Sequence, residues 1–301
     1  MRELKAMIQR DTKLFFKDKG MFFTSLVTPL ILLLLFVTFL GNVYRESFEN
    51  FIPAGMEVPE ELLEGFVGGW LFSSLLAVCC VTVAFCSNML MVQDKVTGAR
   101  ADLTMAPVKK STLAFGYYIS TALATMIICA VALLACFLYL YRVGWYLSAE
   151  DVLFTLLDVF LLVLFGTALS SVVNFFLSTQ GQITAVGTII SAAYGFICGA
   201  YMPISQFSDG IQKFISFLPG TYGTALLHKH LMRGVLDELE GAYFPSEVVE
   251  QIRDGFDNNL YFLDNKVETS TMYLILGGSI LALMVIYVLL NMGKQAIRRS
   301  K

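Results

Sequence analysis

The stretch 183–227 begins like a membrane-spanning helix and does not end like one. Its apolar run is interrupted at Gly199–Pro203, and a second, shorter apolar piece ends at Pro219 and Gly220. Glycine costs backbone entropy in a helix and proline has no N–H to donate, so both residues end helices. Inside a bilayer, such breaks survive only where protein or a water-filled cavity satisfies the freed backbone groups. The pattern predicts a span followed by a segment, 202–227, that re-enters the membrane from the same side; the alternative is an apolar patch on a plain outer loop.

The chain as a whole is too apolar for a soluble protein, with 56% hydrophobic residues, 15% charged residues and a mean hydropathy of +0.69. About 20 apolar residues are needed to cross the roughly 30 Å of hydrocarbon in a bilayer. The charge-free run 159–208 is too long for one crossing and divides at the polar turn 178–182. The sequence therefore predicts an all-α integral membrane protein with six transmembrane helices, at 20–41, 66–92, 113–140, 152–177, 183–201 and 271–292.

Basic and acidic residues are distributed unevenly between the two sides of these spans. Residues 1–19, the loop 93–110 and the C-terminal tail hold 14 of the 21 Lys and Arg, whereas the three larger loops hold 18 of the 24 Asp and Glu. Basic residues accumulate in cytoplasmic loops. We therefore expect a multi-pass protein of the cell membrane with both termini cytoplasmic, and with 42–65, 142–151 and 202–270 outside. This charge pattern does not suggest a nucleic-acid partner.

Two features are typical of membrane interfaces. Residues 1–19 are amphipathic, with apolar side chains at helical spacing and basic ones around them, which predicts a helix lying in the interface with the lipid bilayer. A basic anchor that only sets topology is the alternative. Trp70 and Trp145 fall at the outer ends of the second and third predicted spans, where aromatic belts are found.

No residue pattern points to catalysis. All six cysteines fall inside predicted spans, so neither a disulfide framework nor a zinc site is expected. The chain contains no GxxxxGK[ST] phosphate loop and no HExxH motif. We therefore expect no enzyme activity, no metal and no cofactor in this chain.

Three polar residues are exceptions in this apolar sequence. His228 and His230 form an HxH pair, which favours interfacial hydrogen bonding over a metal site because no third ligand is evident. Asp158 is the one ionisable residue within a predicted span. A carboxylate inside a membrane points to function by default. A transport role, a hydrogen bond between helices and a water-exposed position near the outer interface all remain open for Asp158.

The fifth predicted span carries small residues four apart. Small residues at this spacing let two helices approach closely. They predict either a dimer interface or packing within the same chain. The stripe consists of Gly187, Ser191, Gly195 and Gly199.

Two segments resemble the permease subunit of type-2 ABC exporters, the ABC-2 family. Gly199–Pro203 followed by Leu218–Gly223 is similar to the carboxy-terminal signature of that family. The stretch from Asp94 to Gly98, with a proline nine residues later at Pro107, resembles its cytoplasmic loop. The loop departs from the family pattern at Ala99, Ala101 and Thr104, so its docking surface would suit a particular partner.

The resemblance implies a single transmembrane domain, 1–301, that works with other subunits. In this family, two permease chains and two ATPase chains form the transporter, and the ATPase binds ATP and Mg²⁺. The resemblance leaves homodimer and heterodimer equally open. A coupling helix, 94–108 here, would dock into the ATPase. The residues expected to couple the two subunits are Asp94, Gly98, Arg100, Asp102, Leu103 and Pro107.

The re-entrant segment is expected to form an outer gate, followed by an extracellular segment, 228–270. The proline breaks and the short apolar face suggest a rigid element on hinges. The gate residues expected are Gly199, Pro203, Phe214, Phe217, Pro219, Gly220 and Tyr222. The function implied is export of an amphiphilic or hydrophobic substrate, such as a drug, an antimicrobial peptide or a lipid-like molecule. The alternatives are polysaccharide export and a membrane sensor or resistance partner that transports nothing.

Overall fold

The computed structural model describes residues 2–53, 58–105, 108–197, 199, 201–263 and 265–299, without the side chains of Lys110 and of 293–299. The first half of the chain consists of α1 (Arg2–Lys17), α2 (Lys19–Leu35), the π-helical η1 (Phe36–Leu40), α3 (Gly41–Glu49), α4 (Glu60–Val96), α5 (Ala99–Met105) and α6 (Lys110–Val143). The second half consists of α7 (Ala149–Phe176), α8 (Gln180–Ile197), the 3-10 turn η2 (Ile204–Gln206), α9 (Asp209–Ser216), α10 (Pro219–Ala242), α11 (Ser246–Gly255), β1 (Tyr261–Phe262), β2 (Asn265–Lys266) and α12 (Thr269–Arg299).

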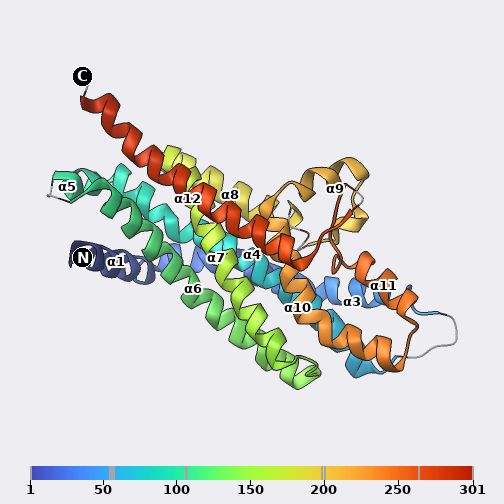
Figure 1. The fold of residues 1–301 in the computed structure, drawn as a ribbon. Coiled ribbons are helices and arrows are strands. Elements are labelled where there is room, and N and C mark those ends of the chain that lie inside the picture. Colours follow the sequence, from blue (N-terminus) through green and yellow to red (C-terminus); the bar gives the residue numbers. More distant parts are fainter. Residues whose placement is uncertain are drawn as a thin grey trace.

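The helices form an elongated bundle around α4 (Figure 1). α4 runs for 37 residues and packs against α2, α6, α7, α8 and α10. In the most apolar 18-residue stretch of α4, 94% of the residues are buried. The corresponding stretch is 22% buried in the continuous helix from Lys19 to Glu49 and 17% buried in α12. The two chain ends and α5 lie at one end of the bundle, and α9 and α11 lie toward the other. α4 is therefore the core around which the other helices are arranged.

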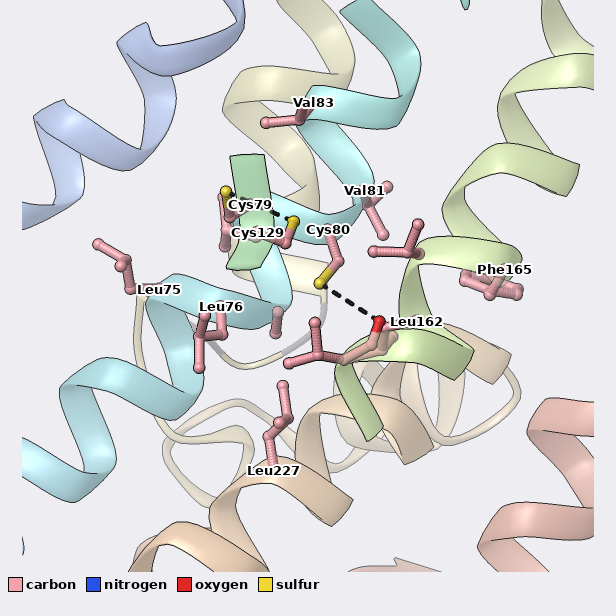
Figure 2. Packing of buried hydrophobic residues seen from close by; sticks show 14 of the residues in the cluster. Leu75, Leu76, Cys79, Cys80, Val81, Val83, Cys129, Leu162, Phe165 and Leu227 are labelled. Atoms are coloured by element: carbon pink, nitrogen blue, oxygen red, sulfur yellow. Dashed lines mark hydrogen bonds between the residues drawn. The ribbon is translucent and has the colours of Figure 1, made fainter. Parts of the chain in front are cut away.

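Helices α4 and α7 pack closely through buried side chains such as Leu76, Cys80 and Leu162 (Figure 2). A Cβ on Gly166 of α7 would lie 2.9 Å from the carbonyl oxygen of Cys80, so only glycine fits there. The sulfurs of Cys79 and Cys129 lie 3.9 Å apart and join α4 to α6. The cysteines in the described part are buried free thiols that fill space as small apolar side chains. Cys198 lies outside the described residues.

The described residues include five helices that are long and apolar enough to cross a membrane, which confirms an all-α membrane protein. These helices are Lys19–Glu49, Glu60–Val96, Ser111–Val143, Ala149–Phe176 and Thr269–Met292. The fifth predicted span corresponds to α8, which has 18 residues and is not among the five. The expected polar turn precedes α8, where the side chain of Gln182 accepts a hydrogen bond from the backbone N–H of Ser178 at 2.8 Å. The count of six spans stays a prediction.

The expected outer loop 42–65 is helical over its first part. Helix α3 continues to Glu49 because its aromatic side chains pack on α4. The rings of Tyr44 and Trp70 lie 4.1 Å apart, and those of Phe48 and Phe66 lie 4.5 Å apart. Trp70 is only 1% exposed, so its assignment to an aromatic belt was wrong.

The segment after the predicted re-entrant region also differs from expectation. Helix α10 runs without a break from Pro219 to Ala242, so the boundary expected between 227 and 228 falls inside one helix. Further along the chain, residues Ser246–Gly255 form the short helix α11. A small antiparallel hairpin, β1–β2, pairs Tyr261 with Lys266 and was not predicted.

Candidate functional site

A buried ion pair fixes the end of α4 that leads into α5. The carboxylate of Asp94 is 4% exposed and accepts two hydrogen bonds from Arg10 of α1, both at 2.8 Å. It accepts a third from the Tyr117 hydroxyl of α6 at 2.6 Å. Asp11 lies 2.7 Å from the same guanidinium, and burial raises the pKa of Asp11 to about 6, although Arg10 opposes the shift. The amphipathic helix α1 is therefore joined to α4 and α6 by specific polar contacts.

Two more contacts hold the same end of the bundle. The Lys95 ammonium donates to three backbone carbonyls that end α7, those of Asn174, Phe175 and Leu177, at 2.8–2.9 Å. A cation at a helix C-terminus satisfies carbonyls that have no partner within the helix. On α5, Arg100 donates to the side-chain oxygen of Asn291 on α12 at 3.4 Å. The sequence analysis did not single out Arg10, Lys95 or Asn291, because nothing local to each of them shows its distant partner.

Gly98 forms the joint between α4 and α5. Its φ of +85° lies in the left-handed region, and a Cβ built there would meet no atom within 4 Å. Beyond this joint, Leu103 packs against the cluster around Met91, whereas Asp102 and Met105 are exposed. Of the residues expected to couple subunits, Pro107 lies outside the described residues.

The predicted gate residues surround the turn from α9 to α10. Pro203 precedes η2, and Pro219 occupies the first turn of α10, where a missing N–H costs nothing. The Tyr222 hydroxyl donates to the carbonyl of Ser216 at 2.7 Å, closing the turn. A Cβ on Gly220 would lie 2.7 Å from the Tyr194 hydroxyl, so α8 packs tightly here. Phe214 and Phe217 point away from the bundle and are 61% and 64% exposed.

A carboxylate that the sequence analysis missed secures the start of this segment. Asp257, which follows α11, accepts hydrogen bonds from the backbone N–H groups of Ile204 and Ser205. Gly199, with a φ of +77°, lies so close that a Cβ on it would be 3.3 Å from the Asp257 carboxylate. Burial raises the pKa of Asp257 to about 7. Asp257 therefore joins the start of η2, next to the left-handed Gly199, to a distant part of the chain.

The stability of this segment is expected to fall as the pH rises from 5 to 8, because burial disfavours the ionised carboxylate more than the two N–H donors favour it. The pKa of Asp257 is raised from an unfolded value near 3.9, so its contribution to stability is full below about pH 4 and is lost as the pH passes 7. The loss between pH 5 and pH 8 is on the order of 2 kcal/mol. Hydrogen exchange at Ile204 and Ser205, corrected for the intrinsic rate, should be faster at pH 8. Asp257→Asn cannot ionise and should show no such change; an equal pH response in both proteins contradicts the assignment.

The stripe of small residues divides into two pairs. Gly187 and Ser191 line a groove of about 750 Å³ between α2, α4 and α8. Gly195 faces the ring of Tyr201, which a Cβ would approach within 2.3 Å, and Gly199 faces Ile204. The second pair therefore packs within the same chain. The first pair lines the groove, and Gly187 also packs within the chain, because a Cβ on it would lie 2.6 Å from the methyl group of Met89 on α4.

Asp158 is itself fully buried and lies in a polar cluster between three helices. One of its oxygens is 2.6 Å from Nδ1 of His230 on α10, and the other accepts a hydrogen bond from the Tyr273 hydroxyl of α12 at 2.7 Å. The His230 ring stacks on Phe154 with centroids 5.0 Å apart. Asp158 has no exposed surface, which excludes the water-exposed position. Its carboxylate forms the hydrogen bond between helices that the sequence left as one possibility.

The other histidine faces α4. Nε2 of His228 lies 3.1 Å from the Ser74 hydroxyl, and its ring stacks on Trp70. His228 and His230 thus serve different helix pairs, because residues two apart point to opposite sides of a helix. Among the described residues, no group of three or more His, Cys, Asp or Glu is arranged to hold a metal ion.

A comparison with known protein families identifies the family to which this fold belongs. Residues 2–231 match the family model described as ABC-2 type transporter. The chain belongs to the ABC-2 family. No curated protein matches it in a sequence comparison. As an ABC-2 permease, the chain is a membrane component of an ABC transporter rather than a catalytic domain, and permeases of this family work with an ABC ATPase.

The family match covers most, but not all, of the site in this ABC-2 permease. It includes the α4–α5 joint, α8, α9 and both histidines of α10. The partners supplied by Asp257, Tyr273 and Asn291 lie beyond its end at residue 231. Residues 232–242 of α10 and everything after them are therefore features of this chain that the family description leaves open.

Proposed function

We propose that this chain is the permease subunit of an ATP-driven exporter for an amphiphilic or hydrophobic substrate, such as a drug, an antimicrobial peptide or a lipid-like molecule. In this proposal, the termini and α5 face the cytoplasm, as the distribution of Lys and Arg suggests. Two copies of an ABC ATPase supply ATP and Mg²⁺ binding. A second permease chain, identical or different, completes the transporter.

The observation that carries the proposal is the attachment of α5. The end of α4 from which it continues is tied to α1 through Arg10 and Asp94 and to α7 through Lys95. α5 itself is tied to α12 through Arg100. Its remaining face, with Asp102 and Met105, is exposed. An element anchored to several helices and open on one side is suited to receive force from a separate subunit. Because Asp94 is buried, its part in coupling would be to position α5, not to contact the ATPase.

The groove along α2 and α8 supports the choice of substrate class. Its lining combines apolar side chains such as Val27, Ile31 and Ile183 with hydroxyls such as Thr184 and Ser191. Binding sites for small molecules are mostly apolar with a few oriented polar groups. In the proposal, a second permease chain closes this groove to form the transport path. The α9–α10 turn, with Gly199 and Pro203 before it, serves as the outer gate.

Transport by reconstituted protein tests the proposal. The permease, purified with its ATPase, is placed in liposomes with the ATPase outside, and ATP-dependent accumulation of a fluorescent amphiphile is followed. A Walker-motif variant of the ATPase that binds but does not hydrolyse ATP is the control. Accumulation that requires hydrolysis supports export. If the amphiphile stimulates hydrolysis but does not enter, the chain is a sensor and the proposal fails.

A further inference from the structure

The hairpin β1–β2 covers a groove of about 440 Å³ where α12 begins. The floor of this groove is apolar and comes from three elements: Phe217 at the end of α9, Phe262 of the hairpin and Ile275 of α12. The rings of Phe217 and Phe262 meet edge to face, with centroids 5.1 Å apart. Lys266 at the end of β2 and Glu268 on the short connection into α12 also line the groove, at its rim. Phe217 is also one of the predicted gate residues, but Lys266 and Glu268 have no part in the proposed transport cycle.

The groove lies where the candidate membrane span of α12 begins. The candidate span of α12 starts at Thr269, and Ile275 is six residues further along, which places it about 9 Å deeper at 1.5 Å per residue. Next to the groove, α9 presents the exposed side chains of Ile211 and Phe214. Apolar side chains at this depth face lipid, so their exposure is not costly. The groove therefore leads from headgroup level into the hydrocarbon.

The rim of the groove carries one positive charge, on Lys266, and one negative charge, on Glu268. The Lys266 ammonium uses one contact for Glu250, at 2.6 Å, and has two further N–H donors. The Glu268 carboxylate is exposed, and its one hydrogen bond among the described residues is a long one of 3.4 Å from the Ser270 hydroxyl. A phosphate would pair with Lys266, and a primary ammonium would pair with Glu268. Lys266 and Glu268 are separated by a single residue and line the same groove. The headgroup of an aminophospholipid likewise carries a phosphate and an ammonium, joined by a short linker.

We propose that this groove binds one zwitterionic aminophospholipid from the leaflet at that end of α12, with an acyl chain on Phe217 and Ile275 and the headgroup between Lys266 and Glu268. A lipid with a net negative charge would supply the phosphate but would place no cation near Glu268, so it should bind more weakly. The bound lipid would fill the space between α9, the hairpin and α12. This proposal depends on the position of the groove and its charges, and not on transport.

Native mass spectrometry of the full-length protein tests the proposal. The protein is delipidated in detergent and then offered equal amounts of phosphatidylethanolamine and phosphatidylglycerol with the same acyl chains. We expect one retained phosphatidylethanolamine, favoured about tenfold, because one charge-assisted contact of about 1.4 kcal/mol corresponds to a factor of ten. Glu268→Gln, a surface change that should leave folding intact, is expected to remove this preference. Equal retention of both lipids by the unmodified protein overturns the proposal.

A matched pair of variants tests the floor of the groove. Ile275→Trp should fill the groove and abolish retention of either lipid. Leu274→Trp, at a neighbouring position that is 74% exposed and does not line the groove, should retain the lipid as the unmodified protein does. Equal retention by both variants would show annular lipid only and would overturn the proposal. If Ile275→Trp does not assemble, the headgroup comparison with Glu268→Gln decides the question.

Discussion

Asp158→Ala is expected to lower the free energy of unfolding in a bilayer by about 2 kcal/mol. The change leaves His230 Nδ1 and the Tyr273 hydroxyl without their common partner inside the bundle. Each buried polar group without a partner costs about 1–3 kcal/mol. Polar contacts between membrane helices contribute less than this to the free energy of unfolding. The loss expected for His230 and Tyr273 together is therefore near the lower end, about 2 kcal/mol. Unfolding of the protein in lipid nanodiscs, followed by heat or by steric trapping, measures the difference.

Asp158→Asn is the matched control. Its carbonyl oxygen can still accept from Tyr273, and its amide can donate to Nδ1 of His230 in the other tautomer, so the loss should stay below about 1 kcal/mol. Similar losses in Asp158→Ala and Asp158→Asn would show that the polar contacts do not stabilise the bundle. The same variant separates structure from transport: if Asp158→Asn is stable but does not transport, the charge of the carboxylate has a role of its own.

Gly98→Val is expected to reduce ATP-driven transport about tenfold while leaving the amount of protein in the membrane unchanged. The φ of +85° at this joint costs a side chain with a Cβ about 1–2 kcal/mol, and a β-branched residue is the least suited to it. The chain can relieve this strain by rotating α5, which would break the contacts that its Arg100 makes with Asn291 and its Leu103 makes with the cluster around Met91. An energy of about 1.4 kcal/mol corresponds to a factor of ten. Initial transport rates at equal protein density provide the measurement.

Gly98→Asn distinguishes backbone conformation from bulk. Asparagine is of similar size to valine but enters the left-handed region more readily. Because no atom lies within 4 Å of a Cβ at this position, asparagine should fit and should retain most of the transport. If Gly98→Asn and Gly98→Val fail equally, the joint tolerates no side chain for a reason other than its backbone angle.

The membrane helices could be predicted because a charge-free run is a local property of the sequence. Five of the six predicted spans correspond to helices long and apolar enough to cross a bilayer. The proline breaks at Pro203 and Pro219 were also local, and each begins a new helical element in the structure. The extension of α3 was not predicted, because it depends on the packing of Tyr44 and Phe48 against α4.

The polar contacts of the candidate site could not be predicted in the same way. Arg10 and Asp94 are 84 residues apart, and Asp158 is 72 residues from His230 and 115 from Tyr273. Periodicity compares residues within a few helical turns, so it identified Asp158 and His230 separately and could not pair them. The strands β1 and β2 have two residues each, too few to show an alternating pattern.

The unbroken course of α4 has a mechanical consequence. At 37 residues it is a rod about 55 Å long, with no proline along its length and neighbours packed around it. Its neighbour on one side is built differently, since the helix from Lys19 to Glu49 contains Pro29 and the π-helical turn η1, features at which helices bend. A push on Val96 would therefore tilt α4 as a stiff body and move its far end at Glu60 at once. In the proposed transport cycle, α2 and η1 beside the groove would bend instead. The width of the groove would then change with each movement of α4.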